Sequence, residues 1–373
     1  MATPRVRIRM YRVGFGDCFL ITFPGPQHML VDCGSLAGDE AMPDVVRDIA
    51  ALTGGHIGVV VATHRHGEHV SGFAALAHQW NQLRVDEVWM PWTEDPGDMR
   101  AVGLKRRQDH IAETLVQVAP TESARIAANS KTNQRALDVL FDGFSGNPKR
   151  HYMAAAEGEV HTEALRGVHA RVIGPSRDEL TLDGLEVGCS LASLSVDAMT
   201  QDDDGPFGAK WRLTKRDAKR LFRKELENHW LPEAGDSDTT EQLCYWLDKT
   251  VNNTSLFLLL RYGRARLLFP GDAAGQAWIP FMEQSDLAWE LQHINFYKVS
   301  HHGSHNGTPQ SIIDKMEHPA SMVSTLSEPW PELPHRPLLR QLGTRGSVIR
   351  SDRPGPARGF KKGPFWTELE LPA

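Results

Sequence analysis

The stretch "THRHGEHVSG", residues 63–72, constrains the fold of this 373-residue chain more than any other segment. It follows the apolar run "HIGVVVA", residues 56–62, whose length and β-branched content predict a buried strand. Four side chains that can bind a metal fall within six residues of what we expect to be a tight loop: His64, His66, Glu68 and His69. Because α/β folds place ligands at the carboxyl ends of strands, this stretch predicts a metal site at a sheet edge.

Three further apolar runs end in side chains of the same kind. Asp32 lies in "VDCGS", Asp272 in "FPGDA", and His301 and His302 in "VSHHGS". Each of these residues alone is typical of an ordinary turn or of a hydrogen-bonded loop, but four such strand ends together indicate one shared site. If the runs are neighbouring parallel strands, the side chains converge at one end of the sheets. Imidazole nitrogens and carboxylate oxygens suit Zn, Mn or Fe.

The hydrophobic pattern predicts two strand-rich parts of the chain, each with its own helices. Alternating or continuous apolar runs predict strands at 5–13, 17–23, 28–35, 56–62, 85–92, 168–175, 254–272 (two strands), 294–300, 321–325 and 347–351. A 3.6-residue spacing predicts helices at 40–52, 72–80, 110–119, 133–144, 275–284 and 336–342. Residues 176 to about 250 are polar and read as irregular. This order favours two sheets packed face to face with helices outside.

The charge balance gives no general signal for a nucleic-acid partner. The formal net charge is −6 and the pI is about 6.3, so any basic surface must be local. The segment Lys210–Lys224 holds eight Lys or Arg residues. Four of them could hold a phosphodiester backbone: Lys215, Arg216, Lys219 and Arg220. The alternative is a solvated helix face, partly balanced by neighbouring acids, and the sequence leaves both open.

The histidine stretch resembles the HxHxDH signature of the metallo-β-lactamase fold. Five other segments resemble the hydrolase domain of the DNA-uptake protein ComEC and its soluble relatives: "VGFGDCFLI", "MLVDCGS", "NNTSLFLLLRYGRARLLFPGDA", "KVSHHGSHNGTP" and "PHRPLLRQLGTRGSVIRSDRPG". The resemblance covers about 1–90, 165–175 and 250–355. It implies an α/β (α+β) fold, a four-layer αββα sandwich. We therefore expect a single domain over 1–373, with helical insertions at about 95–165 and 176–250.

The same resemblance implies a role for each candidate residue, and a cofactor of two divalent ions, Zn or Mn. His64 and His66 would bind the first ion. The second would be bound by Glu68, His69 and either His301 or His302. Asp272 would bridge both ions and Asp32 would orient the cluster, so that Asp32, Glu68 and Asp272 form the catalytic set. Ser304 and His305, which follow the histidine pair, are candidates for contact with substrate.

Two departures from the family signature affect these expectations. Glu68 stands where the signature has Asp, and its side chain is one methylene longer. The segment before Asp272 reads "VNNTS", where many relatives have another histidine for the first ion. Asn252 or Asn253 would fill that place. Occupancy by a single ion is the alternative.

The sequence thus favours a metal-dependent hydrolase that uses a metal-activated water. The resemblance implies a phosphodiester as substrate, either nucleic acid or a small phosphodiester, with nuclease activity as the leading version. One alternative is a lactonase, a thioesterase or a small-molecule phosphodiesterase. Another is a non-catalytic binding or sensing module that is stabilised by metal. No apolar segment approaches the roughly 20 residues that span a bilayer, and "MATPRVRIRM" has no signal-peptide core, so we expect no membrane partner and a cytoplasmic location. The sequence does not indicate an oligomeric state.

Overall fold

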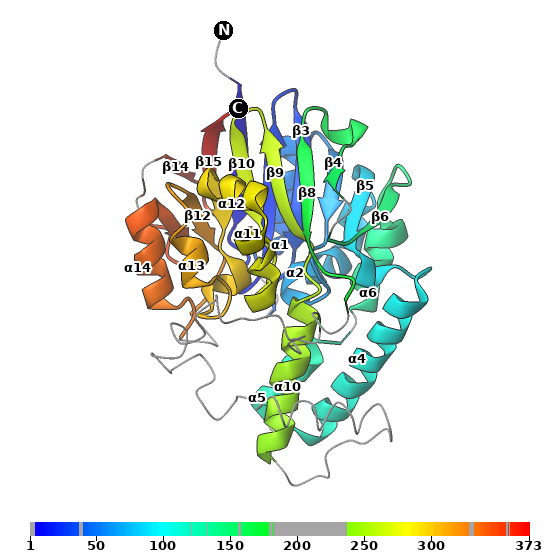
Figure 1. Cartoon of the computed structure of the whole chain (residues 1–373). Helices are drawn as coiled ribbons and strands as arrows, with labels where there is room; N and C mark the ends of the chain where they lie inside the picture. Colours follow the sequence, from blue (N-terminus) through cyan, green and yellow to red (C-terminus); the bar gives the residue numbers. More distant parts are fainter. Residues whose placement is uncertain are drawn as a thin grey trace.

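Two β-sheets pack face to face in the computed structural model of the chain (Figure 1). The structure describes residues 4–36, 40–119, 121–131, 133–155, 158–178, 182, 237–327, 332–355, 357 and 359–373. The predicted basic residues Lys215, Arg216, Lys219 and Arg220 lie outside these ranges.

The described residues form an eight-stranded and a seven-stranded sheet. Across the first sheet the order is β14 (Phe360–Lys362), β15 (Trp366–Pro372), β1 (Arg5–Tyr11), β2 (Cys18–Phe23), β3 (Gln27–Cys33), β4 (His56–Val61), β5 (Arg84–Pro91) and β6 (Lys149–Met153). Across the second it is β13 (Val348–Arg350), β12 (Ala320–Val323), β11 (Phe296–Lys298), β10 (Ala265–Phe269), β9 (Phe257–Tyr262), β8 (His169–Gly174) and β7 (Glu159–Val160).

Helices cover the outer face of each sheet. The first sheet carries α1 (Met42–Thr53), α2 (Gly67–Ala75), α3 (Ala77–Trp80) and α6 (Gln134–Asp138), the last continued by the π-helical η2 (Val139–Gly143). The second carries η5 (Gly275–Trp278), α11 (Pro280–Glu283), α12 (Ser285–Gln292), α13 (Gln310–Ile313) and α14 (Arg336–Arg345). Short 3₁₀ turns are η1 (Trp92–Glu94), η3 (Glu163–Leu165) and η6 (Ser300–Gly303). The four-layer αββα sandwich expected from the sequence is therefore confirmed.

The main core lies between the two sheets and follows from alternation along the strands. In β1, Val6, Ile8 and Met10 point between the sheets and pack against residues of the second sheet such as Leu258 and Leu267. Successive side chains of a strand point to opposite faces, so each strand contributes every second residue to this layer. Burial of this apolar surface fixes both the packing of the sheets and the register of their strands.

A third helical layer covers the end of the sandwich at which the parallel strands finish. It consists of α4 (Met99–Val118), α5 (Thr121–Asn129) and α10 (Ser237–Asn252), which lie together in Figure 1. Leu115, Ala127 and Leu247, one from each helix, belong to one buried apolar cluster. The reading of residues 176–250 as irregular was wrong for 237–250, which belong to α10. No helix of the described residues is both long and apolar enough to cross a membrane.

Strand direction brings the predicted site residues to this end. β3 and β4 are parallel in the first sheet, and β10 and β11 are parallel in the second. Asp32 lies at the carboxyl end of β3, and Asp272 follows β10 by three residues. Since the four strands finish at one end of the sandwich, side chains from distant parts of the sequence meet there.

Candidate metal centre

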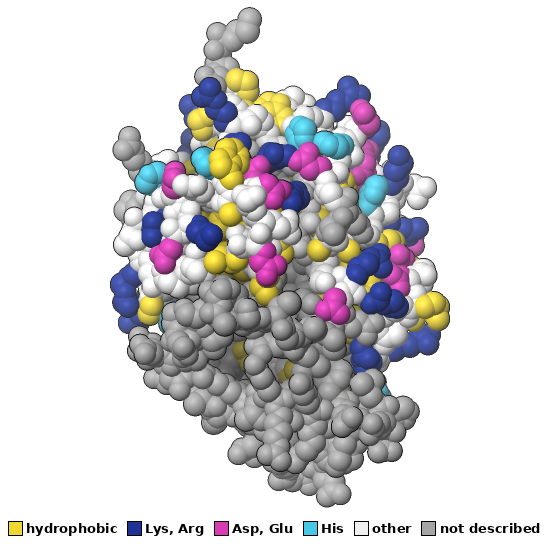
Figure 2. Space-filling model, in the orientation of Figure 1, with side chains coloured by type: hydrophobic (Ala, Val, Ile, Leu, Met, Phe, Trp, Pro, Cys, Tyr) yellow, Lys and Arg dark blue, Asp and Glu magenta, His cyan; other side chains and the backbone are white. Residues whose placement is uncertain are grey.

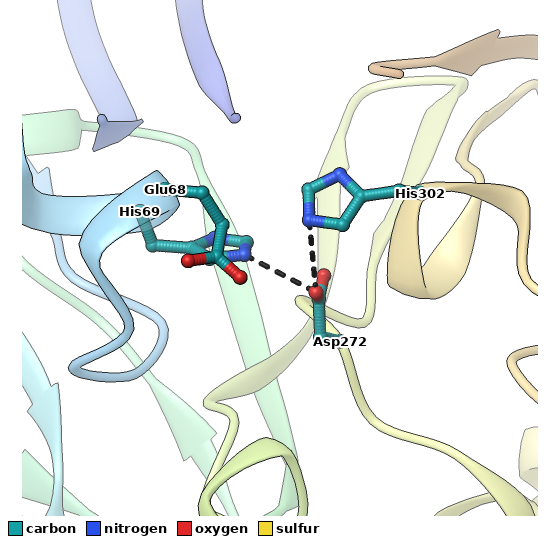
Figure 3. A group of neighbouring side chains, drawn as sticks. All are labelled: Glu68, His69, Asp272 and His302. Carbon is teal, nitrogen blue, oxygen red and sulfur yellow. Dashed lines mark ion pairs between the residues drawn. The ribbon is translucent and has the colours of Figure 1, made fainter. Parts of the chain in front are cut away.

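Four buried side chains meet between the two sheets: Glu68, His69, Asp272 and His302 (Figure 3). One nitrogen or oxygen atom from each lies within 4.8 Å of the others. Asp272 Oδ2 is 3.2 Å from His69 Nε2 and 3.1 Å from His302 Nε2. Two atoms that bind one tetrahedral zinc ion lie about 3.3 Å apart, so these separations suit shared ligands of a cation.

Helix α2 positions Glu68 and His69. The helix begins inside the histidine stretch, with His66 as its N-cap, so the prediction of a tight loop was wrong for Glu68 and His69, whereas His64 and His66 precede the helix. The His66 carbonyl accepts hydrogen bonds from the backbone N–H groups of His69 and Val70, which places Glu68 and His69 in the first turn. A Cβ at Gly34 would lie 2.5 Å from the Glu68 carbonyl carbon, so only glycine lets the loop after β3 pack against this turn.

Asp32 fixes the orientation of His69 from behind. Its Oδ2 accepts hydrogen bonds from the Thr63 hydroxyl at 2.7 Å and from His69 Nδ1 at 2.8 Å, and its Oδ1 accepts from Thr63 N at 2.7 Å. The proton of His69 therefore sits on Nδ1, and Nε2 points at Asp272. Asp32 has a φ of 57°, a left-handed conformation that costs free energy in a residue with a Cβ.

The two histidines after β11 point to different places. Both have a positive φ. Among the described residues, four that are not glycine have a positive φ, and three of them lie at this site: Asp32, His301 and His302. His302 donates from Nδ1 to the Ser324 carbonyl at 2.9 Å, which leaves Nε2 directed at Asp272. His301 Nε2 instead lies 3.3 Å from Asn252 Nδ2. Of the two, His302 joins the four-residue group.

His64 and His66 form a second pair of donors beside this group. His64 Nε2 and His66 Nδ1 lie 3.1 Å apart, and both side chains are buried. The Thr63 and Ser255 hydroxyls lie 3.2 and 3.3 Å from His64 Nδ1 and can accept its proton, which leaves Nε2 free of hydrogen. Burial lowers the pKa of both imidazoles well below the usual value, so both rings are neutral. Neutral imidazole is the form that binds metal.

Helix α10 borders this histidine pair. Asp248 Oδ1 lies 3.7 Å from His66 Nε2, and Asp248 Oδ2 accepts a hydrogen bond from Asn252 Nδ2 at 3.0 Å. Asn252 is buried, and its Oδ1 has no hydrogen-bond partner. Asn253 points away and donates to the Leu182 carbonyl at 2.9 Å. Of the two asparagines named from the sequence, Asn252 therefore borders the site.

A buried lysine holds Asp272. Lys298 Nζ lies 3.0 Å from Asp272 Oδ1 and 2.6 Å from Asp17 Oδ2, and it donates to the Gly271 carbonyl at 2.8 Å. The Lys298 side chain is 2% exposed. Burial lowers the pKa of Lys298, but the two carboxylates raise it above the usual value, so the lysine is charged. Only Oδ2 of Asp272 thus remains available to another cation.

The charges of the central group depend on one another. Burial opposes a charge on Asp272, but His302, Lys298 and His69 hold the pKa of its carboxyl well below the usual range. Burial lowers the pKa of His69, but the Asp272 and Asp32 carboxylates raise it well above the usual value. Burial raises the pKa of Glu68. Protonated imidazoles thus balance Asp272 in the absence of a bound ion.

The remaining predicted residues lie outside the four-residue group. Ser304 is buried, with its Oγ 3.0 Å from His301 Nδ1 and 2.5 Å from Asn306 Oδ1, to which it donates. The His305 ring lies 6.2 Å from the His335 ring, measured between centroids. A separate group at the sheet edge is exposed and consists of Glu159, His161 and His169.

Sequence reasoning missed Asp17, Lys298, Asp248 and the orienting Thr63. One signal was available for Lys298, because a lysine in the otherwise apolar run "INFYKV" has to be buried on a strand and paired. Asp17 follows the tight turn "GFG" and precedes a fully buried strand. Asp248 carried no such signal, because its neighbours in the sequence were read as polar and irregular.

Figure 2 shows one face of the molecule in the orientation of Figure 1. Over the described residues of this face, Lys and Arg side chains are interspersed with Asp and Glu. The acidic side chains of the site do not form part of this surface, because Asp17, Asp32, Glu68 and Asp272 are all buried.

Residues 11–152 match the family model described as the metallo-beta-lactamase superfamily. No curated protein matches the chain. Among solved structures, the chain is similar to the metallo-beta-lactamase fold protein YhfI from Bacillus subtilis, at 8% identity and a TM-score of 0.39 over 94% of this chain and 98% of the other. It is also similar to Igni18, a metallo hydrolase from the archaeon Ignicoccus hospitalis, at 9% identity and a TM-score of 0.43 over 98% of both chains.

A third similar structure is a diphosphatase of the PhnP family, at 11% identity and a TM-score of 0.37 over 92% of this chain and 85% of the other. Identities and scores this low say nothing about substrate. The matched residues 11–152 include the histidine stretch with its ligand-like side chains and six of the strands of the first sheet, in part or whole. Over residues 11–152 the chain is therefore similar to the metallo-beta-lactamase superfamily.

Proposed function

We propose that the protein is a hydrolase that depends on two divalent metal ions and cleaves phosphodiester bonds. The observation that carries the proposal is a set of buried polar atoms that make no hydrogen bond although they converge. These atoms are Glu68 Oε2, His69 Nε2, Asp272 Oδ2 and His302 Nε2. Buried polar atoms without a hydrogen bond cost free energy, and here only the ion pairs of Asp272 with His69 and His302 offset that cost. A cation bound between the four atoms would remove it.

The residues present fit two divalent ions. His64, His66 and Asn252 would hold the first ion, Glu68, His69 and His302 would hold the second, and Asp272 would contribute a carboxylate to the site. Five carboxylates and one charged lysine lie at the site, so the set of donors is acidic overall. Burial raises the pKa of Glu68 and of Asp248, and a bound cation would keep both ionised. The mixture of imidazole and carboxylate donors suits Zn or Mn.

Divalent ions bound there would supply Lewis-acid stabilisation and a water of lowered pKa. The chain itself holds the protons and excludes solvent. Asp32 and the Ser324 carbonyl keep a proton on the Nδ1 atoms of His69 and His302, so their Nε2 atoms remain donors to a cation. Lys298 keeps Asp272 ionised and fixes its rotamer. The burial of the ligands strengthens every electrostatic interaction in the site.

The ComEC-like segments "VGFGDCFLI" and "KVSHHGSHNGTP" support a phosphodiester as the substrate class. The close covering of the site favours small or single-stranded phosphodiesters over duplex DNA, since the central ligands are at most 5% exposed. The same covering supports the second candidate, a lactonase or thioesterase with a narrow pocket.

The test is a screen of the purified full chain, reconstituted with Zn or Mn, against bis(p-nitrophenyl) phosphate, single-stranded DNA, RNA, a lactone and a thioester. We expect metal-dependent cleavage of at least one phosphodiester, and loss of that activity in Asp272→Asn. Cleavage of only the lactone or the thioester would favour the second candidate. A metal-loaded protein that cleaves none of them would indicate a binding module.

A further inference from the structure

The first pair of histidines has two ligand nitrogens but lacks the third histidine that many proteins of this fold supply. In its place the fold presents one face of α10. Asp248 and Asn252 are four residues apart, so their side chains share a face of the helix. That face meets the site, since Asp248 Oδ1 lies 3.7 Å from His66 Nε2 and Asn252 Nδ2 lies 3.3 Å from His301 Nε2.

A comparison of the four histidines shows what His66 requires. In the other three, the nitrogen that faces away from the site has a clear acceptor. The acceptors are Asp32 for His69, the Ser324 carbonyl for His302, and the Thr63 and Ser255 hydroxyls for His64. For His66 the corresponding atom is Nε2, because Nδ1 faces His64. Ser130 Oγ, at 3.4 Å, forms a hydrogen bond with it, and the carboxylate beside it, that of Asp248, lies 3.7 Å away.

Asp248 is an unusual residue for its position unless a cation lies nearby. It lies one turn before the carboxyl end of α10, where the helix dipole disfavours a negative charge. Its side chain is only 19% exposed, so solvent offsets little of that cost. Among the described residues, no Lys or Arg side chain forms an ion pair with it, and its one ionisable partner is His66. Its only described hydrogen bond comes from Asn252, which is itself buried.

We propose that Asp248 is the positioning residue of the first metal site, the carboxylate that accepts the Nε2 proton of His66, and that Asn252 holds it there. The proposal rests on the proposed metal-dependent function. A cation bound by His66 Nδ1 fixes the proton of the ring on Nε2 and makes that N–H a stronger donor. The present 3.7 Å separation is longer than a hydrogen bond, so we expect Asp248 to move closer when the ion binds.

The proposal gives the α10 segment a part in the chemistry. α10 is tied to the histidine stretch by a buried polar chain, in which Arg65 donates to Gln108 at 2.6 Å and Gln108 donates to Thr250 at 3.2 Å. Thr250 lies between Asp248 and Asn252 in the sequence. These hydrogen bonds therefore fix the position of α10 relative to His66, the ligand that Asp248 would orient.

The test is a titration of the metal-free full chain with Co²⁺, followed by calorimetry and by the visible spectrum. Asp248→Asn keeps the size and removes the charge. We expect it to weaken one of the two binding steps at least tenfold and to change the cobalt spectrum, and we expect Asp248→Glu to restore part of the affinity. Asp138→Asn, the same change on an exposed helix surface, is the matched control and should leave both steps unaltered.

The outcomes separate this proposal from the one on which it rests. If the wild-type chain binds two ions and Asp248→Asn binds both with unchanged affinity and spectrum, Asp248 has no part in the site and the proposed function stands. If the wild-type chain binds no metal, both proposals fall. If Asp248→Asn unfolds, the Asp248→Glu titration decides, since an affinity equal to wild type in a folded protein supports a carboxylate at this place and total loss of one step contradicts it.

Discussion

Glu68 is the residue at which the histidine stretch departs from the HxHxDH signature, and the structure buries it. It is 5% exposed, with Oε1 3.8 Å from His66 Nδ1 and Oε2 unpaired. The longer side chain reaches the group because it starts from the first turn of α2, beside His69 (Figure 3). At a helix N-terminus a carboxylate is also favoured by the helix dipole.

Glu68→Gln should therefore lower the affinity for one metal ion at least tenfold, about 1.4 kcal/mol, because it removes a charge and keeps the size. Glu68→Asp, which restores the residue of the signature, should be tolerated better if α2 can move toward the group. Calorimetric metal titration of both variants gives the comparison. Unchanged metal affinity and turnover in Glu68→Gln would mean that the group works with His69, Asp272 and His302 alone.

Lys298 is the residue whose loss we expect to destabilise the metal-free fold most. Its removal leaves Asp17 as a buried carboxylate without the lysine and leaves Asp272 with His69 and His302 alone. Lys298→Met should lower the free energy of unfolding by about 3–5 kcal/mol. The measurement is urea unfolding in the presence of a chelator. Lys361→Met, which removes an exposed pair with Glu370, is the control and should cost less than about 1 kcal/mol. Equal effects of the two changes would contradict a buried, charged Lys298.

Metal affinity should rise with pH because of His69. In the folded state the pKa of this ring lies well above the usual value. Burial lowers the pKa, but the Asp272 and Asp32 carboxylates raise it by more. In the metal-free protein His69 is therefore protonated at neutral pH, and a metal ion must displace the Nε2 proton. Affinity should increase with pH until the pH exceeds that raised pKa, with protons released on binding. Calorimetry in buffers of different ionisation enthalpy measures the release, and a proton count of zero at neutral pH would contradict it.

At the scale of elements, local sequence patterns predicted most strands and the two segments that carry the histidines. They failed to predict strands whose pairing partner is distant in the sequence. β15 pairs with β1 along its whole length, but these strands lie at opposite ends of the chain, so nothing near either one announces the partner. β6 and β14, also not predicted, are short edge strands of the same sheet. In α10 the signal existed, since Leu243, Leu247 and Val251 repeat every four residues, but the polar residues between them hid it.

The candidate site was also predictable only in part. Strand ends rich in His and Asp gave the ligand candidates, because those residue types are rare at the end of buried strands without a purpose. The residues that orient the ligands were not predictable, since Thr63, Ser324 and Asp248 are ordinary residues until the fold places them. Which of His301 and His302 faces Asp272 depends on a left-handed turn that no local pattern reveals.

The helical layer and the histidine stretch are held together at Arg65. Its buried guanidinium pairs with Glu94 at 3.2 Å and donates to Gln108 of α4. Arg65→Met should loosen α4 and α10 and leave the sandwich closed, because the sheets have their own core. Hydrogen exchange read by mass spectrometry should rise in 99–118 and 237–252 and stay constant in β1 to β3.

Arg150→Met, which removes an exposed pair with Asp142, is the control for that experiment. A uniform rise of exchange over the whole chain in Arg65→Met would show that Arg65 supports the fold in general rather than the helical layer.

At the scale of the whole molecule, the two sheets contribute to one site. Asp32, Glu68 and His69 come from the part of the chain that forms the first sheet, and Asp272 and His302 follow strands of the second. A metal ion bound between them ties the sheets to each other, and binding to the folded state alone raises stability as the ion concentration exceeds its dissociation constant. The catalytic proposal and the stability of the closed sandwich thus depend on the same ligands.

The most direct test is the metal content of the full chain, purified without chelator and supplied with Zn and Mn, measured by elemental analysis. A His161→Ala background removes a ligand from the exposed group and keeps any ion held there out of the count. The account predicts about two equivalents of transition metal per chain, and a loss of at least one in Asp272→Ala. A reproducible value near zero, or a content that Asp272→Ala leaves unchanged, would contradict it.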